Sequence, residues 1–189
     1  MGYFHKDRSR SLDSVLDPSV PSGVKPGEVV VDYGCGVGCY SWSMARGAGP
    51  EGRLLAVDID PGVLGFISFV AGRRGIPQVE TVLAARESPN LKHSSVDRIF
   101  LIDVYNVLAG LDLLGSGRPS PRVVSTMQRL VNALRKGGHL VLIDFIPQPG
   151  LPHVSEEQAV RDMGDLGLDL VDKRPAPAHG MYVLTFEKP

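Results

Sequence analysis

The segment EVVVDYGCGVG, residues 28–38, decides the fold of this chain. Residues 28–33 form a near-continuous apolar run, which predicts a parallel strand buried on both faces. Three glycines at alternate positions follow and precede a helix predicted over 40–48. Glycine permits a tight turn and the close approach of a ligand to the backbone, and the helix N-terminus offers free N–H groups. The segment therefore predicts a ligand of nucleotide type at the carboxyl end of this strand.

Beyond this segment, short β-type runs alternate with helical runs, which is typical of an α/β sheet with crossover helices. Asp60 is a predicted N-cap, and Pro61 is the first residue of a helix that runs to Arg74. The polar stretch 84–95 predicts a short or missing helix, and the Gly/Pro/Ser-rich stretch 110–121 predicts a loop. Further strands are predicted at 54–57, 79–83, 96–102 and 139–145.

The clearest helix signal begins at Ser120-Pro121, where the apolar residues that follow fall on one helical face. The sequence KGG at 136–138 is predicted to close this helix with a cation and a glycine cap.

The last third of the chain predicts one helix and two strands. Ser155 and Gln158 form a predicted capping box for a helix that ends near residue 166. Strands predicted at 168–173 and 181–186 have no helix between them and should pair antiparallel. Together, these elements predict a doubly wound α/β fold. Its sheet has seven strands, mostly parallel with one antiparallel strand, and helices on both faces.

Composition limits the class of protein. The 189 residues fit one domain, and 22 Gly plus 15 Pro, about 20%, stay below the ~25–30% that indicates disorder. The net charge of −1 argues against a dominant electrostatic nucleic-acid binder, although a local basic patch stays open. The two cysteines, Cys35 and Cys39, lack metal-ligand spacing, so we expect no metal site. No apolar run reaches the ~18–20 residues of a membrane span, and residues 1–10 lack the apolar core of a signal peptide, so we expect a cytoplasmic protein.

The spacing of the glycines distinguishes between cofactors. The dinucleotide fingerprint is G-x-G-x-x-G, whereas here the third glycine arrives one residue early and position 39 is Cys39. This disfavours a nicotinamide oxidoreductase. The second strand ends in Asp58, which follows the first glycine, Gly34, by 58 − 34 = 24 residues. A carboxylate at that place can accept hydrogen bonds from the ribose hydroxyls of either cofactor.

The G-x-G-x-G spacing after an acidic strand end resembles the first motif of class I, Rossmann-like S-adenosylmethionine-dependent methyltransferases. Several other segments resemble the same family: AVDID at 56–60, SVDRI at 95–99 and LRKGGHLVLID at 134–144. The sequence IDVYNVL at 102–108 is similar to a variant found in small, mostly uncharacterised enzymes related to the ubiquinone and menaquinone biosynthesis methyltransferases. The resemblance covers nearly the whole chain. It implies one methyltransferase domain over 1–189, with residues 1–26 as a lead-in that covers the cofactor site.

The resemblance implies roles for individual residues. Asp32 should order the glycine loop and reach the methionine amino group through water. Asp58 should bind the ribose hydroxyls, and Ile59 should stack on adenine. Asp103 should flank the methionine moiety through its carbonyl or its carboxylate. The full set of expected contacts to S-adenosylmethionine, or to the product S-adenosylhomocysteine, is Asp32, Gly34, Cys35, Gly36, Gly38, Asp58, Ile59, Arg86 and Asp103.

The chain departs from the family pattern at two places. An acidic residue often follows the third strand and contacts the adenine amino group, but here Ala85 stands at that position and Arg86 and Glu87 follow. We therefore expect Arg86 at the adenine end of the site, with the adenine contact made by a backbone amide or by Glu87. Asn106 stands where the related enzymes often have His, which affects any chemistry that depends on that His.

The catalytic group is not identified by the sequence. Tyr105 could gate the transfer site or orient a substrate, and His153 is the first choice for a general base, ahead of His5 and His179. Methyl transfer needs a base only if the nucleophile must lose a proton early. The expected acceptor is a small molecule. A protein or an RNA acceptor stays open, as does a cofactor-binding subunit that requires a partner chain.

Overall fold

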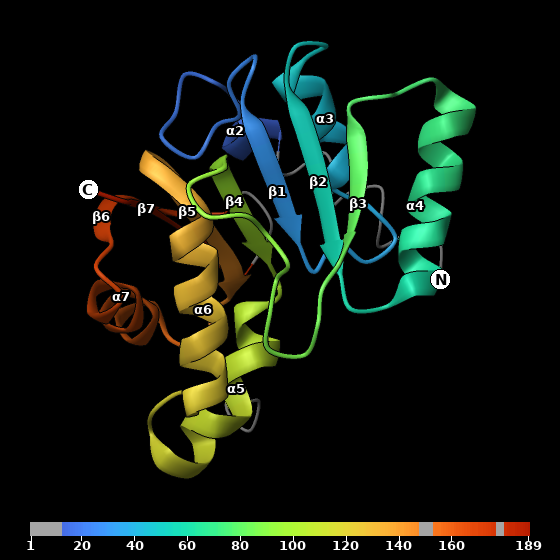
Figure 1. Ribbon diagram of the computed structural model, residues 1–189. Coiled ribbons are helices and arrows are strands. Elements are labelled where there is room, and N and C mark those ends of the chain that lie inside the picture. Colours follow the sequence, from blue (N-terminus) through green and yellow to red (C-terminus); the bar gives the residue numbers. More distant parts are fainter. Residues whose placement is uncertain (1–12, 148–152, 177–179) are drawn as a thin grey trace.

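The computed structural model describes residues 13–147, 153–176 and 180–189. They contain one seven-stranded sheet in the order β3-β2-β1-β4-β5-β7-β6, with helices on both faces (Figure 1). Strand β7 is antiparallel to both of its neighbours, whereas the pairs from β3 to β5 are parallel. The predicted fold class is therefore confirmed. The strands are β1 Val29–Tyr33, β2 Arg53–Asp58, β3 Val79–Leu83, β4 Val96–Ile102, β5 Leu134–Phe145, β6 Asp169–Pro175 and β7 Met181–Glu187.

The helices agree with the sequence patterns in most places. The stretch 84–95, all of which the structure describes, contains no helix, as predicted. The predicted loop at 110–121 is wrong over its first half, because a helix runs from Tyr105 to Ser116. The helices are α2 Asp13–Leu16, α3 Ser41–Ala48, α4 Pro61–Arg74, α5 Tyr105–Ser116, α6 Pro121–Ala133 and α7 Glu156–Asp165. No helix in this described part of the chain is long and apolar enough to cross a membrane.

The helix ends test the predicted caps. Asp60 caps α4 as predicted, since its Oδ1 accepts the Gly62 N–H at 2.7 Å. Ser155 caps α7 through the Gln158 N–H at 3.2 Å. The second half of that capping box is wrong, because the Gln158 amide donates to Asp162 at 2.7 Å instead.

The predicted glycine cap after α6 is also wrong. The helix ends at Ala133, and Leu134 is already extended and pairs with Val96 of β4. Gly137 lies within β5 at a φ of +73°, and its N–H donates to the Lys188 carbonyl at 2.7 Å. Gly137 therefore lies in an irregular first part of β5 and does not cap α6. The strand starts earlier than the local sequence indicates because Leu134 already pairs with β4.

Two apolar layers hold the helices on the sheet. On one face, Val31, Leu55 and Ile99 pack with residues of α5, α6 and α7. On the other face, Val30 and Leu54 pack with residues of α2 and α3. Helix α4 lies on this second face beside the edge strand β3 (Figure 1).

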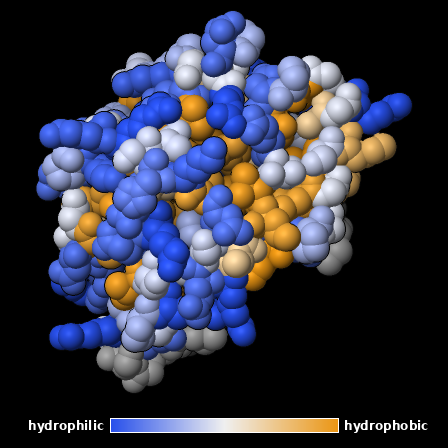
Figure 2. Space-filling model, in the orientation of Figure 1, coloured by the Kyte–Doolittle hydropathy of each residue, from blue (hydrophilic) through white to orange (hydrophobic). Residues whose placement is uncertain are grey.

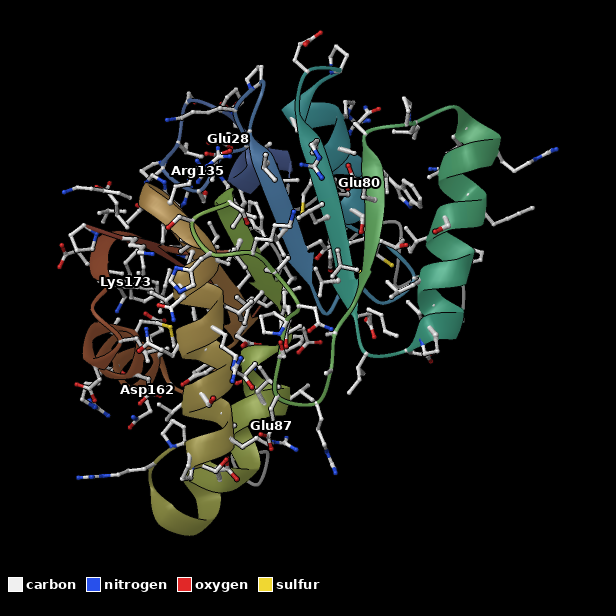
Figure 3. The ribbon with its side chains drawn as sticks, viewed as in Figure 1. Glu28, Glu80, Glu87, Arg135, Asp162 and Lys173 are labelled. Atoms are coloured by element: carbon white, nitrogen blue, oxygen red, sulfur yellow. The ribbon has the colours of Figure 1, made fainter. Side chains whose placement is uncertain are left out.

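An ion pair and the chain before β1 close the amino end of the sheet. The fully buried guanidinium of Arg98 donates to both carboxylate oxygens of Glu28, at 3.0 and 2.9 Å, and to the Pro21 carbonyl at 2.7 Å. Glu28 and Arg135 mark this end of the sheet in Figure 3. Val24 lies against α3, since a Cβ built on Gly47 of that helix would be 3.1 Å from the Cβ of Val24. Residues 13–26, which were predicted as part of a lead-in over the cofactor site, therefore lie at the amino end of the sheet. Residues 1–12 of that lead-in lie outside the described ranges.

Candidate functional site

The strand order creates a crevice between β1 and β4. From β3 at one edge, the chain returns to place β4 on the other side of β1, and ligands bind at such a switch point outside the carboxyl ends of the strands. A cavity of about 330 Å³ opens there. It brings together five of the predicted site residues, namely Gly34, Asp58, Ile59, Arg86 and Asp103. Its lining also includes Tyr33, Val104, Val107, Leu108 and Arg122, which sequence reasoning did not identify.

The glycine loop has a backbone that few other residues can adopt. Gly34, Gly36 and Gly38 have φ values of +76°, +51° and +80°. A Cβ on Gly34 would lie 2.6 Å from Val104, and one on Gly38 would lie 2.4 Å from Ile67. At Gly36, a Cβ would meet no atom within 4 Å. At Gly34 and Gly38, both the left-handed φ and a close side chain disfavour a Cβ, whereas Gly36 leaves open space that a ligand can enter.

Asp58 fixes this loop to the end of β2. Its Oδ2 accepts the Gly36 N–H at 3.0 Å, and its Oδ1 accepts the Asp60 N–H at 3.0 Å. The carboxylate is partly exposed at the cavity. Since each carboxylate oxygen can accept a second hydrogen bond, Asp58 can still accept hydroxyl groups of a ligand.

Asp32 lies beneath the loop and has an exposed fraction of 2%. Its Oδ2 accepts the Ser41 hydroxyl at 2.5 Å, which ties the end of β1 to the first residue of α3. Burial raises the pKa of Asp32 to about 6, although the Ser41 hydrogen bond lowers it, and the nearby Asp58 charge raises it further. Through Ser41, Asp32 joins the two ends of the glycine loop, and it is not among the residues that line the cavity. The sequence gives Ser41 no signal of its own.

Cys35 contributes its backbone to the loop rather than its thiol. The Cys35 N–H donates to the Val57 carbonyl at 3.1 Å, and the side chain packs with Ala56 and Ile67. Burial, followed by the charges of Asp32 and Asp58, raises the pKa of the Cys35 thiol far above its ordinary value. A thiolate role at this position is therefore disfavoured.

Asp103 turns the chain at the end of β4. It has a left-handed φ of +58°, which a residue other than glycine adopts rarely, and its N–H donates to the Ile143 carbonyl at 2.8 Å. Such strain is concentrated at functional sites. The exposed Asp103 side chain lies on the cavity next to Val104.

Behind Asp103 lies a buried polar pair that the sequence did not reveal. Asp144 of β5 accepts both the backbone and the side-chain N–H of Asn106, at 3.0 and 2.8 Å. Burial raises the pKa of Asp144 to about 7 against the lowering effect of the Asn106 N–H, and the Asp103 charge adds to the rise. Asn106, in turn, accepts the Val154 N–H at 2.6 Å, so this pair fixes the residue that follows His153.

The adenine end of the expected site is less polar than the family pattern. Ile59, 60% exposed, lines the cavity together with Ala85 and Arg86. The Ala85 N–H already donates to the Ser88 carbonyl at 2.8 Å, within a turn that ends at Ser88. Glu87 is exposed on this turn and is not part of the cavity lining (Figure 3).

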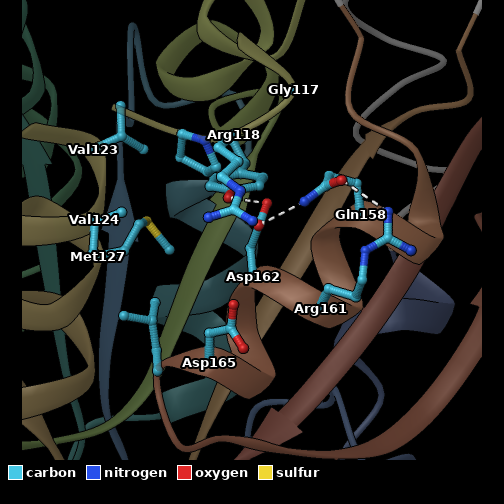
Figure 4. A pocket seen from close by; sticks show the side chains of 12 residues that line it. Gly117, Arg118, Val123, Val124, Met127, Gln158, Arg161, Asp162 and Asp165 are labelled. Carbon is cyan, nitrogen blue, oxygen red and sulfur yellow. Dashed lines mark hydrogen bonds between the residues drawn. The ribbon is translucent and has the colours of Figure 1, made fainter. Parts of the chain in front are cut away.

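Tyr105 lies in a different cavity, between α6 and α7. Its hydroxyl donates to Asp162 at 2.7 Å, and Gln158 donates to the same carboxylate at 2.7 Å (Figure 4). This second cavity measures about 420 Å³ and also contains Arg118 and Arg161. Burial and the Asp162 hydrogen bond raise the pKa of Tyr105 far above its ordinary value. This arrangement gives Tyr105 a structural contact to α7, and its predicted gating role gains no support from it.

His153 lies at the end of β5, where its ring stacks on Phe145 with a centroid separation of 5.9 Å. Its Nδ1 lies 3.3 Å from the Ile146 carbonyl. The other two candidate bases, His5 and His179, lie outside the described residues.

Comparison with known proteins places this geometry in a family. A family model described as a methyltransferase domain matches residues 24–173. The chain belongs to this methyltransferase domain family. None of the curated proteins resembles this methyltransferase domain at a significant level.

Solved structures show the same fold at low sequence identity. A SAM-dependent methyltransferase from Aquifex aeolicus has a TM-score of 0.75 at 18% identity, over 96% of this chain and 98% of that chain. Magnesium protoporphyrin IX methyltransferase from Synechocystis, with bound SAM, has a TM-score of 0.73 at 18% identity, over 100% and 86%. A methyltransferase from Haloferax volcanii, in complex with the activator Trm112, has a TM-score of 0.69 at 11% identity, over 97% and 95%.

Proposed function

We propose that this protein is an S-adenosylmethionine-dependent methyltransferase and that its cofactor binds in the cavity at the ends of β1, β2 and β4. The observation that carries this proposal is the cavity lined by Gly34, Asp58 and Asp103, together with the open space at Gly36, whose N–H Asp58 accepts. Family membership and the SAM-bound neighbour support it. The sequence similarity at 102–108 supports a relationship to the ubiquinone and menaquinone biosynthesis methyltransferases.

The charge of the site favours this cofactor over a dinucleotide. In the described part of the chain, no ion pair joins Asp32 or Asp144 to a lysine, arginine or histidine. The excess of carboxylates around the loop would attract the ammonium and sulfonium groups of S-adenosylmethionine. It would repel the pyrophosphate of a nicotinamide cofactor. Arg86 and Arg122 lie at the cavity as well, and we assign them to the adenine side.

We assign the contacts as follows. Asp58 accepts the ribose hydroxyls through the acceptor sites that Gly36 and Asp60 leave open. Ile59 covers one face of adenine. The methionine part lies over the glycine loop beside Asp103, while Asp32 holds that loop from behind.

The bound cofactor supplies a methyl group on a positively charged sulfur, which a nucleophile can attack in line. The contribution of this chain is then to position the reactants and exclude water, and such positioning can supply roughly 7–11 kcal/mol at best. Asn106 and Asp144 support this role, because they connect the start of α5 with Val154. We keep His153 as the proposed base for an acceptor that must lose a proton.

We propose a small-molecule acceptor. Next to the residues that we assign to the cofactor, the cavity is lined by the apolar side chains of Val104, Val107 and Leu108, and apolar concave sites suit small ligands. A protein or RNA acceptor is the alternative for this open site. A further alternative is that this protein requires a partner chain, since the Haloferax volcanii methyltransferase forms a complex with an activator.

Calorimetric titration with S-adenosylhomocysteine tests the cofactor, with NAD⁺ as the competing ligand. We expect micromolar binding of the product and no binding of NAD⁺. Asp58→Ala should weaken product binding at least tenfold, about 1.4 kcal/mol.

Asp60→Ala is the matched control, because it removes a neighbouring carboxylate that caps α4. It should lower the free energy of unfolding by about 1 kcal/mol and leave product binding within a few-fold of wild type. Binding of NAD⁺ in place of the product would contradict the proposal. Equal losses of product binding in the two variants would contradict the role of Asp58.

A further inference from the structure

Strand β3 is an edge strand of the described sheet. It pairs only with β2 in the described sheet, and Figure 1 shows it next to α4 at that border. The Gln78 carbonyl and the Ala84 N–H both bond to β2, and peptide groups alternate along a strand. The even-numbered residues therefore face β2, and Val79, Thr81 and Leu83 direct their N–H and C=O groups outward.

The outward groups form a self-complementary pattern. The Val79 N–H already donates to the Ile76 carbonyl, and the Leu83 carbonyl already accepts from Asn90. Within the residues that the structure describes, the outward groups left without a backbone partner are the Thr81 N–H and C=O, the Val79 carbonyl and the Leu83 N–H. In an antiparallel pair centred on Thr81, these groups match those of a second β3 in four hydrogen bonds. Moreover, β3 contains no Lys, Pro or bulge, the devices that usually protect an edge.

Helix α4 lies behind β3 and has an apolar outer surface. No charged residue occurs from Pro61 to Gly72, and Phe66 and Phe69 are 49% and 66% exposed. A helix that is apolar all round is normally buried by a neighbour. Figure 2 shows hydrophobic side chains gathered over the front of the sheet at β2 and β3 as well.

Small residues line the side of α4 that continues past β3. The Ser68 hydroxyl lies 3.2 Å from that of Thr81, so Ser68 marks the side toward the edge. Gly65 and Gly72 lie about one turn away on either side of it. A Cβ on either glycine would meet no atom within 4 Å, and neither has a positive φ. Since glycine in a helix interior costs about 1 kcal/mol relative to alanine, packing among the described residues of one chain does not account for Gly65 and Gly72.

We propose that two copies of this chain pair through β3 and α4 about a two-fold axis at Thr81. The pairing continues the sheet across the axis and keeps both α4 helices on the same face. Because α4 contacts both β2 and β3, the two helices lie about two strand spacings apart, ~10 Å, which is a normal helix packing distance. Gly65 of one copy then lies beside Gly72 of the other, and the two Phe69 side chains cover the seam.

The charges at the ends of α4 agree with this pairing. The N-terminal end has Asp58 and Asp60, and the C-terminal end has Arg73 and Arg74. Arg74 is held over the Trp42 ring at 5.0 Å, whereas Arg73 is exposed. A two-fold axis places the helices antiparallel, so the exposed Arg73 of each copy faces the acidic end of the other. The same arrangement opposes the two helix dipoles favourably.

The mass of the full chain in solution tests this proposal, measured by light scattering and sedimentation over a dilution series. We expect a dimer, twice the 20.3 kDa of one chain. Phe69→Glu and Thr81→Pro should each weaken dimerisation at least tenfold. Thr81→Pro removes an outward N–H and the hydroxyl that contacts Ser68, but no hydrogen bond to β2, so the pairing with β2 stays intact. Val171→Glu on the opposite edge strand, β6, is the matched control and should leave the mass unchanged.

The double variant Gly65→Ala, Gly72→Ala separates an interface from a local effect. Alanine favours the helix, so the urea midpoint of the monomer should rise, while the dimer dissociation constant should increase at least tenfold because the seam is filled. A monomeric wild type at every concentration would overturn the proposal. A dimer broken by Val171→Glu, or one that the alanine variant strengthens, would also overturn it.

Discussion

The two ends of the sheet treat charge in opposite ways. At the amino end, the buried Arg98 guanidinium is satisfied by Glu28 and the Pro21 carbonyl. At the carboxyl end, Asp32 and Asp144 are buried without an ion pair to any cation that the structure describes, and their pKa values rise to about 6 and 7. At the amino end, the buried charges of Arg98 and Glu28 neutralise each other. At the carboxyl end, the negative charges of ionised Asp32 and Asp144 are left for a cationic ligand to compensate.

This difference assigns the charges at the amino end of the sheet to folding stability and those at the carboxyl end to ligand binding. A paired buried charge stabilises only the arrangement that holds it, and removal of one partner is costly. An uncompensated buried carboxylate costs free energy in the ligand-free protein, which is typical of functional sites. The amino end should therefore respond to mutation through stability, and the carboxyl end through binding and pH.

The largest expected effect breaks the amino end. Arg98→Met leaves Glu28 without its partner and should lower the free energy of unfolding by about 3–5 kcal/mol in urea titrations. Arg53→Met disrupts the exposed pair with Glu80, whose two side chains are 52% and 45% exposed, and should cost less than about 1 kcal/mol. Similar losses in the two variants would contradict the distinction between a buried and an exposed pair.

The next effect concerns pH at the carboxyl end. Between pH 3.8, the ordinary pKa of an aspartate, and about 6, the folded state holds a proton on Asp32 that the unfolded state has released. Stability contributed by this group is therefore lost as pH rises through that window, by an order of magnitude of about 3 kcal/mol. Urea unfolding at a series of pH values should show this loss in the wild type and a smaller one in Asp32→Asn. Equal pH slopes in the two proteins would contradict the raised pKa.

The smallest effects on stability distinguish two glycines of the loop. In Gly34→Ala, the new Cβ would lie 2.6 Å from Val104, and the alanine would have to adopt a φ of +76°. The variant should destabilise the fold by about 2 kcal/mol. Gly36→Ala meets only the φ of +51° and should cost about 1 kcal/mol, yet its methyl group enters the proposed cofactor space. Product binding by Gly36→Ala should fall at least tenfold in calorimetry. Retention of full binding would place the cofactor elsewhere.

Local signals in the sequence predicted most of the fold. The structure confirms strand β1, the Asp60 cap and the missing helix at 84–95. All three could be predicted because each depends on a short-range pattern. The errors occurred where a distant partner decides the conformation. Leu134 leaves α6 because β4 pairs with it. Helix α5 also runs through residues 110–116 against the Gly/Pro/Ser-rich pattern.

The predicted site shows the same division. Sequence spacing predicted Gly34, Asp58, Ile59 and Asp103, each of which ends a strand or follows one directly, so all four meet at one edge of a parallel sheet. It did not find Ser41 beneath Asp32, because the contact joins a strand end to a helix beyond the loop. It also placed Tyr105 beside the transfer site, whereas its hydroxyl turns to Asp162 of α7.

The sequence by itself determined the fold class, the family resemblance and the positions of the glycines and acidic residues. These depend on strand periodicity, on the conformational freedom of glycine and on the rule that parallel strands end together. Only the tertiary structure decided which of the acidic residues are buried and without an ion pair. It also showed the contacts of Asn106 with Asp144 and the exposed edge at β3. Burial and pairing depend on side chains brought together from distant parts of the chain, and no local pattern encodes them.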